Sequence, residues 1–285
     1  MIEVKDIKFK YKGGKALVFD GFSLQLAENR VYGLLGKNGT GKSTLLYLLS
    51  GLLRPTAGSV SCDSAATCKR QPETLQEIFL VPEEFELPTL RLSEYVALYR
   101  PFYPRFSDEI LQNCLRDFEL PEDVKLNALS MGQKKKAFIA FAMATNTKYL
   151  LMDEPTNGLD IPSKSQFRKV VAQYMNDDRL VIISTHQVHD VEQLLDHILM
   201  LDQRSLLLNA STQEITEKYT FEYRLPQQMD DTVLYAEPTL QGNAVIAKRN
   251  AGDPETQVNL ELLFNAVTKG LVKCNSLILR DSVGC

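Results

Sequence analysis

The sequence reads Gly36-Lys37-Asn38-Gly39-Thr40-Gly41-Lys42-Ser43-Thr44 between two apolar segments. Residues 31–35 before it have the composition of a buried strand, and residues 45–49 after it have that of a buried helix. Glycines let the backbone turn tightly, so several N–H groups can point at one anion. A helix N-terminus adds partial positive charge. The stretch therefore predicts a phosphate-binding loop between a strand and a helix.

The side chains after the glycines indicate which phosphate compound this loop binds. Lys42 can reach the β- and γ-phosphates of a nucleoside triphosphate, and the Ser43 hydroxyl can hold Mg²⁺. The alternative is a glycine-rich turn that fits the pattern by chance, and the flanking strand and helix argue against it. We therefore expect a nucleoside triphosphate to bind here.

The composition is that of a soluble globular chain, with 44% hydrophobic and 24% charged residues among 285. A formal net charge of −4 gives no global basic field, which argues against sequence-independent nucleic-acid binding but leaves a local basic patch possible. No apolar run approaches the ~18–20 residues that cross a bilayer. Residues 1–6 alternate charged and apolar side chains, unlike a secretory signal. We expect a cytoplasmic protein.

The cysteines predict reduced, mostly structural thiols. Their number is odd, and no pair has the Cys-x-x-Cys spacing of a metal site. They are Cys62, Cys68, Cys114, Cys274 and Cys285.

Hydrophobic periodicity changes along the chain. Alternation in residues 1–30 predicts short antiparallel strands, and helical spacing in residues 83–146 predicts an inserted helical subdomain. Residues 147–202 return to alternating strand and helix, with apolar runs at 149–152 and 180–183 that are typical of central parallel strands.

The pattern changes again at about residue 221. Short strands are predicted at residues 232–237 and 244–248, and a helix at about residues 259–268. We expect a small appended α+β domain.

Two carboxylates follow the apolar run at residues 149–152. Ligands of open α/β sheets lie at the carboxyl ends of the strands. Asp153 can hold Mg²⁺ there, directly or through water, and Glu154 can accept a proton from an attacking water or orient it. A solvated loop is the alternative reading. His186 also follows a strand, where it is placed to hydrogen-bond a γ-phosphate or to serve as a structural histidine.

Ser130-Met131-Gly132-Gln133 precedes an apolar helical segment at residues 137–144. The Ser-x-x-Gln spacing fits a capping box. Glycine is a poor helix former in the first turn, and the lysines at 134–136 crowd the positive end of the helix dipole. Both features make sense if an anion docks at this helix N-terminus, although the lysines also fit a solvated face.

Together these motifs resemble the ATP-binding subunits of ABC transporters over roughly residues 1–220. The matching segments are the Walker A motif (36–44), the signature motif (129–133), Walker B with the catalytic glutamate (149–154), the D-loop (157–160) and the switch histidine (184–186).

The resemblance implies an α/β fold: a P-loop NTPase with a mostly parallel core sheet, an antiparallel β subdomain and an inserted α-helical subdomain at about residues 84–146. It places the ATP-binding domain at residues 1–220 and leaves residues 221–285 as a small C-terminal α+β extension. Residues 269–285 have no counterpart in the family pattern.

The resemblance also implies roles for single residues, with ATP as substrate and Mg²⁺ as cofactor. Catalysis is carried by Glu154, His186 and Lys42. The metal is held by Ser43, Asp153 and Glu83. The D-loop contributes Asp160, and the opposite subunit's signature motif contributes Ser130, Met131, Gly132 and Gln133. The nucleotide contacts Tyr11 (stacked on adenine), Gly36, Lys37, Asn38, Gly39, Thr40, Gly41, Lys42, Ser43 and Thr44.

Two positions depart from the family pattern. Met131 replaces the first glycine of the signature motif, which predicts altered packing or a shifted dimer affinity. Glu83 stands where the family has a glutamine near Mg²⁺, so it keeps a metal acceptor but adds negative charge. Glu84 could be the matching position instead, and the sequence does not decide between them.

The implied function is ATP-driven transport. ATP closes a dimer with two composite sites, and hydrolysis opens it. The partner is the same chain or another nucleotide-binding subunit, and a membrane-spanning permease supplies the path at the inner face of the membrane. Residues 102–106 and 259–264 look like bacterial exporter-type subunits. Phe85 and Leu87 are expected to line the permease groove. The transported substrate is not indicated.

Two other readings stay open. One is a soluble ABC ATPase of iron–sulfur assembly, DNA repair or the ribosome. Ribosome-associated members usually carry two motif sets, and DNA-repair members carry long coiled-coil or zinc insertions. Neither feature is present in the sequence. The other is a regulatory module that binds ATP without hydrolysis, which is disfavoured because Lys42, Asp153, Glu154 and His186 are all present.

Overall fold

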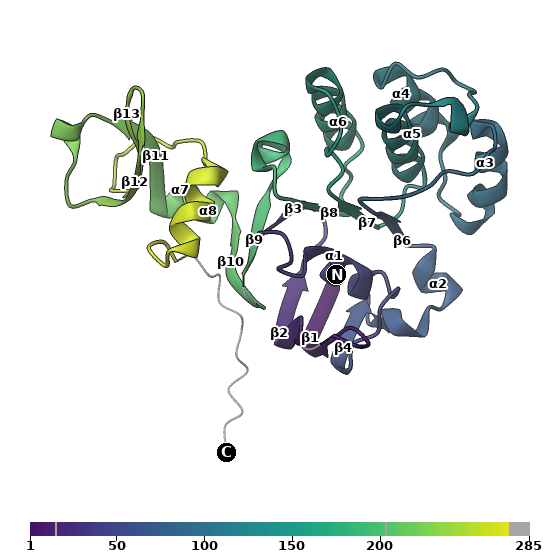
Figure 1. The fold of residues 1–285 in the computed structure, drawn as a ribbon, viewed down its shortest axis with the longest axis horizontal. Coiled ribbons are helices and arrows are strands. Elements are labelled where there is room, and N and C mark those ends of the chain that lie inside the picture. Colours follow the sequence, from purple (N-terminus) through teal and green to yellow (C-terminus); the bar gives the residue numbers. More distant parts are fainter. Residues whose placement is uncertain (15, 203, 274–285) are drawn as a thin grey trace.

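The computed structural model describes residues 1–14, 16–202 and 204–273. Its centre is a six-stranded sheet in which five strands are parallel and the edge strand β10 is antiparallel (Figure 1). In spatial order the strands are β10 (Ser205–Ser211), β9 (His197–Asp202), β3 (Arg30–Leu35), β8 (Leu180–Thr185), β7 (Tyr149–Asp153) and β6 (Ile78–Val81).

The parallel strands bury both faces because their side chains alternate between two cores. In β7, Leu150 and Met152 pack with the helical part of the molecule, whereas Tyr149 and Leu151 pack with the N-terminal part. The helix α1 (Lys42–Leu49) lies on the second face. The fully apolar runs of the sequence therefore form central strands, as predicted.

A four-stranded antiparallel sheet from the N-terminal part covers α1 (Figure 1). Its alternating sequence buries one face and exposes the other. In spatial order its strands are β2 (Phe19–Leu26), β1 (Ile2–Phe9), β4 (Ala57–Cys62) and β5 (Ala65–Ala66). The segment between this sheet and β6 adds η1 (Thr67–Lys69) and α2 (Pro72–Leu75).

The predicted helical insertion lies between β6 and β7 and covers the opposite face of the central sheet (Figure 1). The most buried of its helices is α5, which is apolar on nearly every side from Ala137 to Ala144. Its elements are α3 (Leu92–Tyr99), η2 (Arg100–Phe102), α4 (Asp108–Asp117), η3 (Leu126–Ala128) and α5 (Met131–Ala144). The helix α6 (Ile161–Gln173) packs on the same face after β7.

The C-terminal part holds a three-stranded antiparallel sheet, ordered β11-β13-β12, and one helix (Figure 1). The strands β12 (Val233–Thr239) and β13 (Gly242–Lys248) and the helix α8 (Leu260–Thr268) lie where the sequence predicted strands and a helix. The remaining elements are η4 (Val188–Asp190), η5 (Glu192–Leu194), α7 (Thr212–Lys218), β11 (Tyr219–Arg224) and η6 (Pro226–Gln228).

The sequence did not predict β11. Only Thr220 and Phe221 are buried in it, and Glu222 and Tyr223 after them face solvent at the sheet edge, so the alternation that identifies a strand is too short. In other respects the predicted α/β class, with its parallel core sheet, antiparallel β part, helical insertion and C-terminal α+β part, is confirmed.

Three cysteines that the structure describes, Cys62, Cys68 and Cys114, are free thiols. Burial raises the pKa of the Cys62 and Cys114 thiols to about 12, so these two are inert, as expected of structural thiols. Cys274 and Cys285 lie outside the described residues. None of the described helices is both long enough and apolar enough to span a bilayer.

Candidate active site

The loop at residues 36–44 connects β3 to α1, and its geometry requires two of its glycines. Gly41 caps α1 with a φ of +104°, a left-handed conformation that favours glycine. A Cβ on Gly36 would lie 2.7 Å from the carbonyl oxygen of Leu201 and 2.6 Å from the Thr40 hydroxyl oxygen. The loop can therefore form only with small residues at these points.

Lys42 is buried under this loop, with 6% of its surface exposed. Its Nζ donates to the carbonyl oxygens of Gly36 at 2.8 Å and Lys37 at 3.3 Å, and it lies 4.0 Å from Glu154 Oε1. Burial lowers the pKa of the Lys42 ammonium, and the nearby carboxylates, led by Glu154, act in the opposite direction. Two carbonyls thus hold a cation in place beside a carboxylate.

A cavity of about 340 Å³ opens beside the loop. Tyr11 lines it with its ring partly exposed, and its hydroxyl lies 3.0 Å from Thr44 Oγ1. Glu83 lines the cavity and Glu84 does not, which favours Glu83 of the two positions that the sequence left open. The lining residues are Tyr11, Val18, Asn38, Gly39, Gly41, Lys42, Ser43, Thr44, Glu83 and Glu154.

Three of the predicted loop residues lie elsewhere. Gly36 and Lys37 line a separate cavity of about 480 Å³, together with His186 and residues of α8. Thr40 lines neither of these two cavities, and its hydroxyl donates to the carbonyl oxygen of Lys37 at 2.9 Å. Its side chain therefore stabilises the turn of the loop.

The end of β8 fixes the Glu154 carboxylate, which is only 4% exposed. Thr185 Oγ1 donates to Oε2 at 3.1 Å, and the backbone N–H of His186 donates to Oε1 at 3.0 Å. His186 Nδ1 lies 2.7 Å from the same Oε1. The sequence predicted that Glu154 and His186 lie at the same edge of the central sheet, but it gave no role to Thr185. The signal was available, because Thr185 ends the strand that directly precedes His186.

The oxygen atoms that could bind a metal lie partly at the surface of the cavity and partly buried behind it. Ser43 and Glu83 line the cavity, and Asn157 Nδ2 donates to Glu83 Oε1 at 3.1 Å. Asp153 is 2% exposed and accepts a hydrogen bond from the Ser184 hydroxyl. A hydroxyl and a carboxylate at the cavity, with a second carboxylate behind them, fit the oxygen preference of Mg²⁺.

The signature motif begins α5 with a capping box, as its spacing predicted. Gln133 N–H donates to Ser130 Oγ at 3.3 Å, and Ser130 N–H donates to Gln133 Oε1 at 3.0 Å. Met131 is 67% exposed. Asp160 caps α6 by accepting from the Ser163 N–H at 2.9 Å.

The interpretation of the lysine run as a solvated face is wrong for Lys135. This residue is 5% exposed, and its Nζ donates to the carbonyl oxygens of Glu154 at 3.1 Å and Asn157 at 3.0 Å. Lys136 Nζ donates to the Phe118 carbonyl oxygen at 2.9 Å. Lys135 lies one turn before Ile139 and two turns before Ala142, so it shares their buried side of α5, and this position rather than its charge decides its burial.

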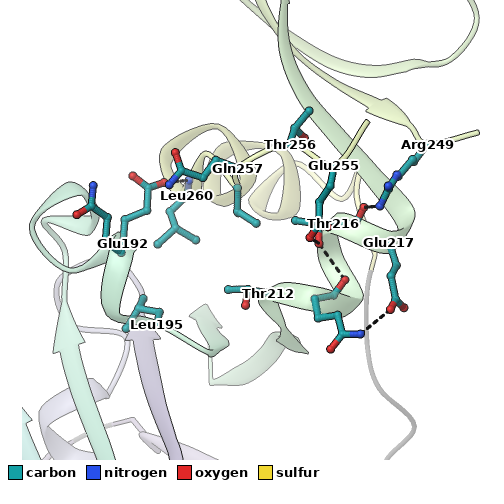
Figure 2. A pocket seen from close by; sticks show the side chains of 13 residues that line it. Glu192, Leu195, Thr212, Thr216, Glu217, Arg249, Glu255, Thr256, Gln257 and Leu260 are labelled. Carbon is teal, nitrogen blue, oxygen red and sulfur yellow. Dashed lines mark hydrogen bonds between the residues drawn. The ribbon is translucent and has the colours of Figure 1, made fainter. Parts of the chain in front are cut away.

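A cavity of about 570 Å³ lies at the junction with the C-terminal part (Figure 2). Its polar side chains already bond to one another: Thr216 Oγ1 donates to Glu255 Oε1 at 3.2 Å, and Gln213 Nε2 donates to Glu217 Oε1 at 2.9 Å. Arg249 donates to the carbonyl oxygen of Thr216 at 2.8 Å. The contacts of Thr216 with Glu255 and Arg249 join α7 to the C-terminal part. Asp153 and Glu154 do not line this cavity.

Comparisons with known proteins agree with the geometry of the 340 Å³ cavity. The ABC transporter family model matches residues 19–157. The cobalt import ATP-binding protein CbiO of Salmonella typhi is 32% identical over 235 residues, covering 75% of this chain and 82% of the relative. The linearmycin resistance ATP-binding protein LnrL of Bacillus subtilis is 31% identical over 213 residues, covering 73% and 68%.

A solved structure supports the same assignment. The dimeric structure of MJ0796, described as a bacterial ABC transporter cassette, superimposes with a TM-score of 0.64 at 27% identity. The match covers 74% of this chain and 98% of that one. On these matches and the site described above, the chain belongs to the ATP-binding subunits of ABC transporters, a family of ATPases.

Proposed function

We propose that this chain hydrolyses ATP in a dimer of nucleotide-binding subunits and thereby powers transport through separate membrane subunits. The observation that carries this proposal is the Glu154 carboxylate, held by Thr185 and His186 at the cavity beside Lys42. A cation, a phosphate-binding loop and an oriented carboxylate at one cavity are what phosphoryl transfer to water requires.

The loop and Lys42 bind the triphosphate of the substrate. Loop N–H groups and the N-terminus of α1 face the phosphates, and Lys42 exchanges its carbonyl partners for phosphate oxygens. The exposed ring of Tyr11 at the cavity rim stacks on the adenine. The residues of the loop from Gly36 to Thr44 contribute to nucleotide binding either by contacting the nucleotide through the backbone or side chain or by shaping the turn of the loop.

Glu154 accepts a proton from the attacking water or orients it, and His186 bonds the γ-phosphate. The hydrogen bonds from Thr185 and from the His186 N–H fix the carboxylate before the reaction, which lowers the cost of orienting it. Mg²⁺, when bound, neutralises charge on the phosphates. Ser43 and Glu83 would hold it directly and Asp153 through water.

The exposure of the signature motif supports the proposed dimer. Ser130, Met131, Gln133 and the D-loop residue Asp160 are exposed, and Gly132 is partly exposed. The neighbouring Ile161 is also 84% exposed. A second copy, or a related subunit, covers this surface and brings Ser130 and Gly132 onto the γ-phosphate. The similar MJ0796 cassette, whose solved structure is dimeric, supports this arrangement.

The substitution Glu154→Gln tests the function most directly. It preserves shape but removes the basic carboxylate, so ATP binding persists while hydrolysis falls by about 100-fold or more. Size-exclusion chromatography with ATP should then show a trapped dimer, whereas wild type returns to monomer as ATP is consumed. A monomeric variant with wild-type turnover would contradict the role of Glu154.

A groove on the other side of the molecule supports the permease partner. A cavity of about 550 Å³ lies between the end of α1, α2 and η2, where Leu52 is 56% and Phe102 64% exposed. Phe85, predicted to line the permease groove, does not line this cavity and packs on Phe138 with ring centroids 4.5 Å apart. Exposed apolar side chains beside a concave surface are typical of a protein contact.

The substitutions Leu52→Asp and Phe102→Asp should therefore abolish binding of the membrane subunit while leaving basal ATP hydrolysis within about twofold. Co-purification in detergent with a co-expressed membrane-spanning subunit measures the first effect. Leu240→Asp, at a fully exposed leucine of the C-terminal part, is the matched control. Unchanged co-purification of both groove variants would refute this docking site.

We also propose export, a location at the inner face of the membrane through the permease, and a domain boundary near residue 220. The relative named for linearmycin resistance supports export, whereas the one named for cobalt import does not, so substrate flux in inverted vesicles decides the direction.

The proposed domain boundary is supported by the way the strands are shared among the sheets. The last strand of the first two sheets is β10, and the first strand of the third sheet is β11.

A further inference from the structure

Lys135 is a buried cation that the function proposed above does not use. Only 5% of its surface is exposed, and no ion pair among the described residues includes it. Both of its bonded partners are neutral backbone carbonyls, those of Glu154 and Asn157. The carboxylates of Glu83, Glu154 and Asp153 act on the Lys135 ammonium only from beyond ion-pair distance. Burying a charge without a directly paired carboxylate is costly, and an unbranched apolar side chain of similar length would fill the space without that cost. The contact therefore needs a reason beyond packing.

The two carbonyls belong to the turn that carries the catalytic carboxylate. Glu154 has a φ of +45°, which a non-glycine residue adopts only when its surroundings hold it there. Its carbonyl oxygen also accepts a hydrogen bond from the Asn157 N–H at 3.2 Å. Lys135 thus clamps both ends of this turn at once, which the three donors of an ammonium group allow.

The same turn reaches the metal side of the cavity. Asn157 Nδ2 donates to Glu83 Oε1 at 3.1 Å, so a shift of the turn would move the Glu154 carboxylate and the Glu83 contact together. On the other side, a Cβ on Gly132 would lie 3.6 Å from the carbonyl oxygen of Gly158. The first turn of α5 therefore packs directly on the turn at residues 154–158.

We infer that Lys135 is a positioning residue for ATP hydrolysis, which locks the turn carrying Glu154 to the helix carrying the signature motif. The inference rests on the proposed function in one respect. In the proposed dimer, α5 contacts the nucleotide of the other subunit, while Glu154 acts on the nucleotide of its own. Lys135 joins these two elements within one chain, so docking of the signature motif at one site sets the geometry of the carboxylate at the other.

The test compares Lys135→Met, which removes the donors, with Lys135→Arg, which retains them. Because a displaced catalytic group costs up to about 100-fold in rate, Lys135→Met should lower kcat by about 10- to 100-fold and change KM for ATP by less than about threefold. Lys135→Arg should recover part of the loss. Lys125→Met, which makes the same charge change at an exposed lysine of the helical insertion, should keep the wild-type kcat. Rates are expressed per nucleotide-binding site, so that unfolded protein does not count as lost catalysis.

A second readout does not depend on activity. Hydrogen exchange in the full chain should become faster at residues 154–158 in Lys135→Met than in wild type and Lys125→Met, with α1 unchanged. If Lys135→Met fails to fold, Lys135→Gln, which retains one amide donor, takes its place with an intermediate effect. Wild-type exchange at residues 154–158 together with a wild-type kcat would overturn the inference, as would a loss confined to KM. Absence of wild-type hydrolysis or of the Glu154→Gln dimer would refute the proposed function separately.

Discussion

The two sides of the proposed composite site differ in how complete they are. On the loop side, Lys42 is 6% exposed and its ammonium already has partners within the chain. On the signature side, Met131 and Ile161 are 67% and 84% exposed. Within a single chain, the loop half of the site is thus packed like a protein interior, whereas the signature half faces solvent. This difference is the one expected if, as proposed, the signature side acts on a nucleotide held by another subunit.

The largest effect that tests this comparison comes from inactivating each side in a separate chain. Lys42→Met removes the cation at the phosphates and should lower hydrolysis by about 100- to 1,000-fold. Gly132→Asp places a carboxylate against the partner's γ-phosphate and should lower hydrolysis to a similar level. The aspartate fits the monomer, because a Cβ there meets only the Gly158 carbonyl oxygen, at an ordinary contact distance of 3.6 Å, and acidic residues suit a helix N-terminus.

Mixing the two inactive variants should restore hydrolysis, since one of the two sites in the mixed dimer combines an intact loop with an intact signature motif. Each variant alone, at the same total concentration, is the control, and ATP binding by Gly132→Asp verifies that its own loop is intact. If the mixture stays inactive while both variants fold, the two sides do not belong to one composite site.

Sequence reasoning could predict the loop side because its determinants are local. Residues 36–44 specify a turn between a strand and a helix, and the apolar runs before Glu154 and His186 place both residues at one edge of a parallel sheet. Residue chemistry and position along a strand are sufficient for these inferences.

The sequence could not predict contacts set by packing between distant segments. Lys135 lies in a run of three lysines, and its burial depends on where the turn at residues 154–158 packs. The choice between Glu83 and Glu84 depended on the direction of the chain after β6. The contact of α8 with the segment after His186 joins residues more than seventy positions apart.

That last contact is a weak point on the otherwise well-packed loop side. His189 Nε2 lies 2.8 Å from Glu261 Oε2 of α8, with both side chains more than 60% exposed. The hydrogen bond to Glu261 raises the pKa of His189 above its ordinary value of 6.5, and Glu192 of the same segment adds to the effect. The ion pair therefore stabilises the fold fully below about pH 6.5 and loses this contribution as the pH rises through the raised pKa.

The substitution Glu261→Gln should thus destabilise the protein at pH 6 and have little effect at pH 8.5, where His189 is neutral in both proteins. The difference should be small, about 0.2–1 kcal/mol, because exposed ion pairs are screened by water. Urea unfolding at the two pH values measures it. Glu217→Gln, which removes a carboxylate bonded to Gln213 rather than to a histidine, should show no such dependence. An equal effect of Glu261→Gln at both pH values would mean that Glu261 stabilises the protein through its charge in the first turn of α8 and not through His189.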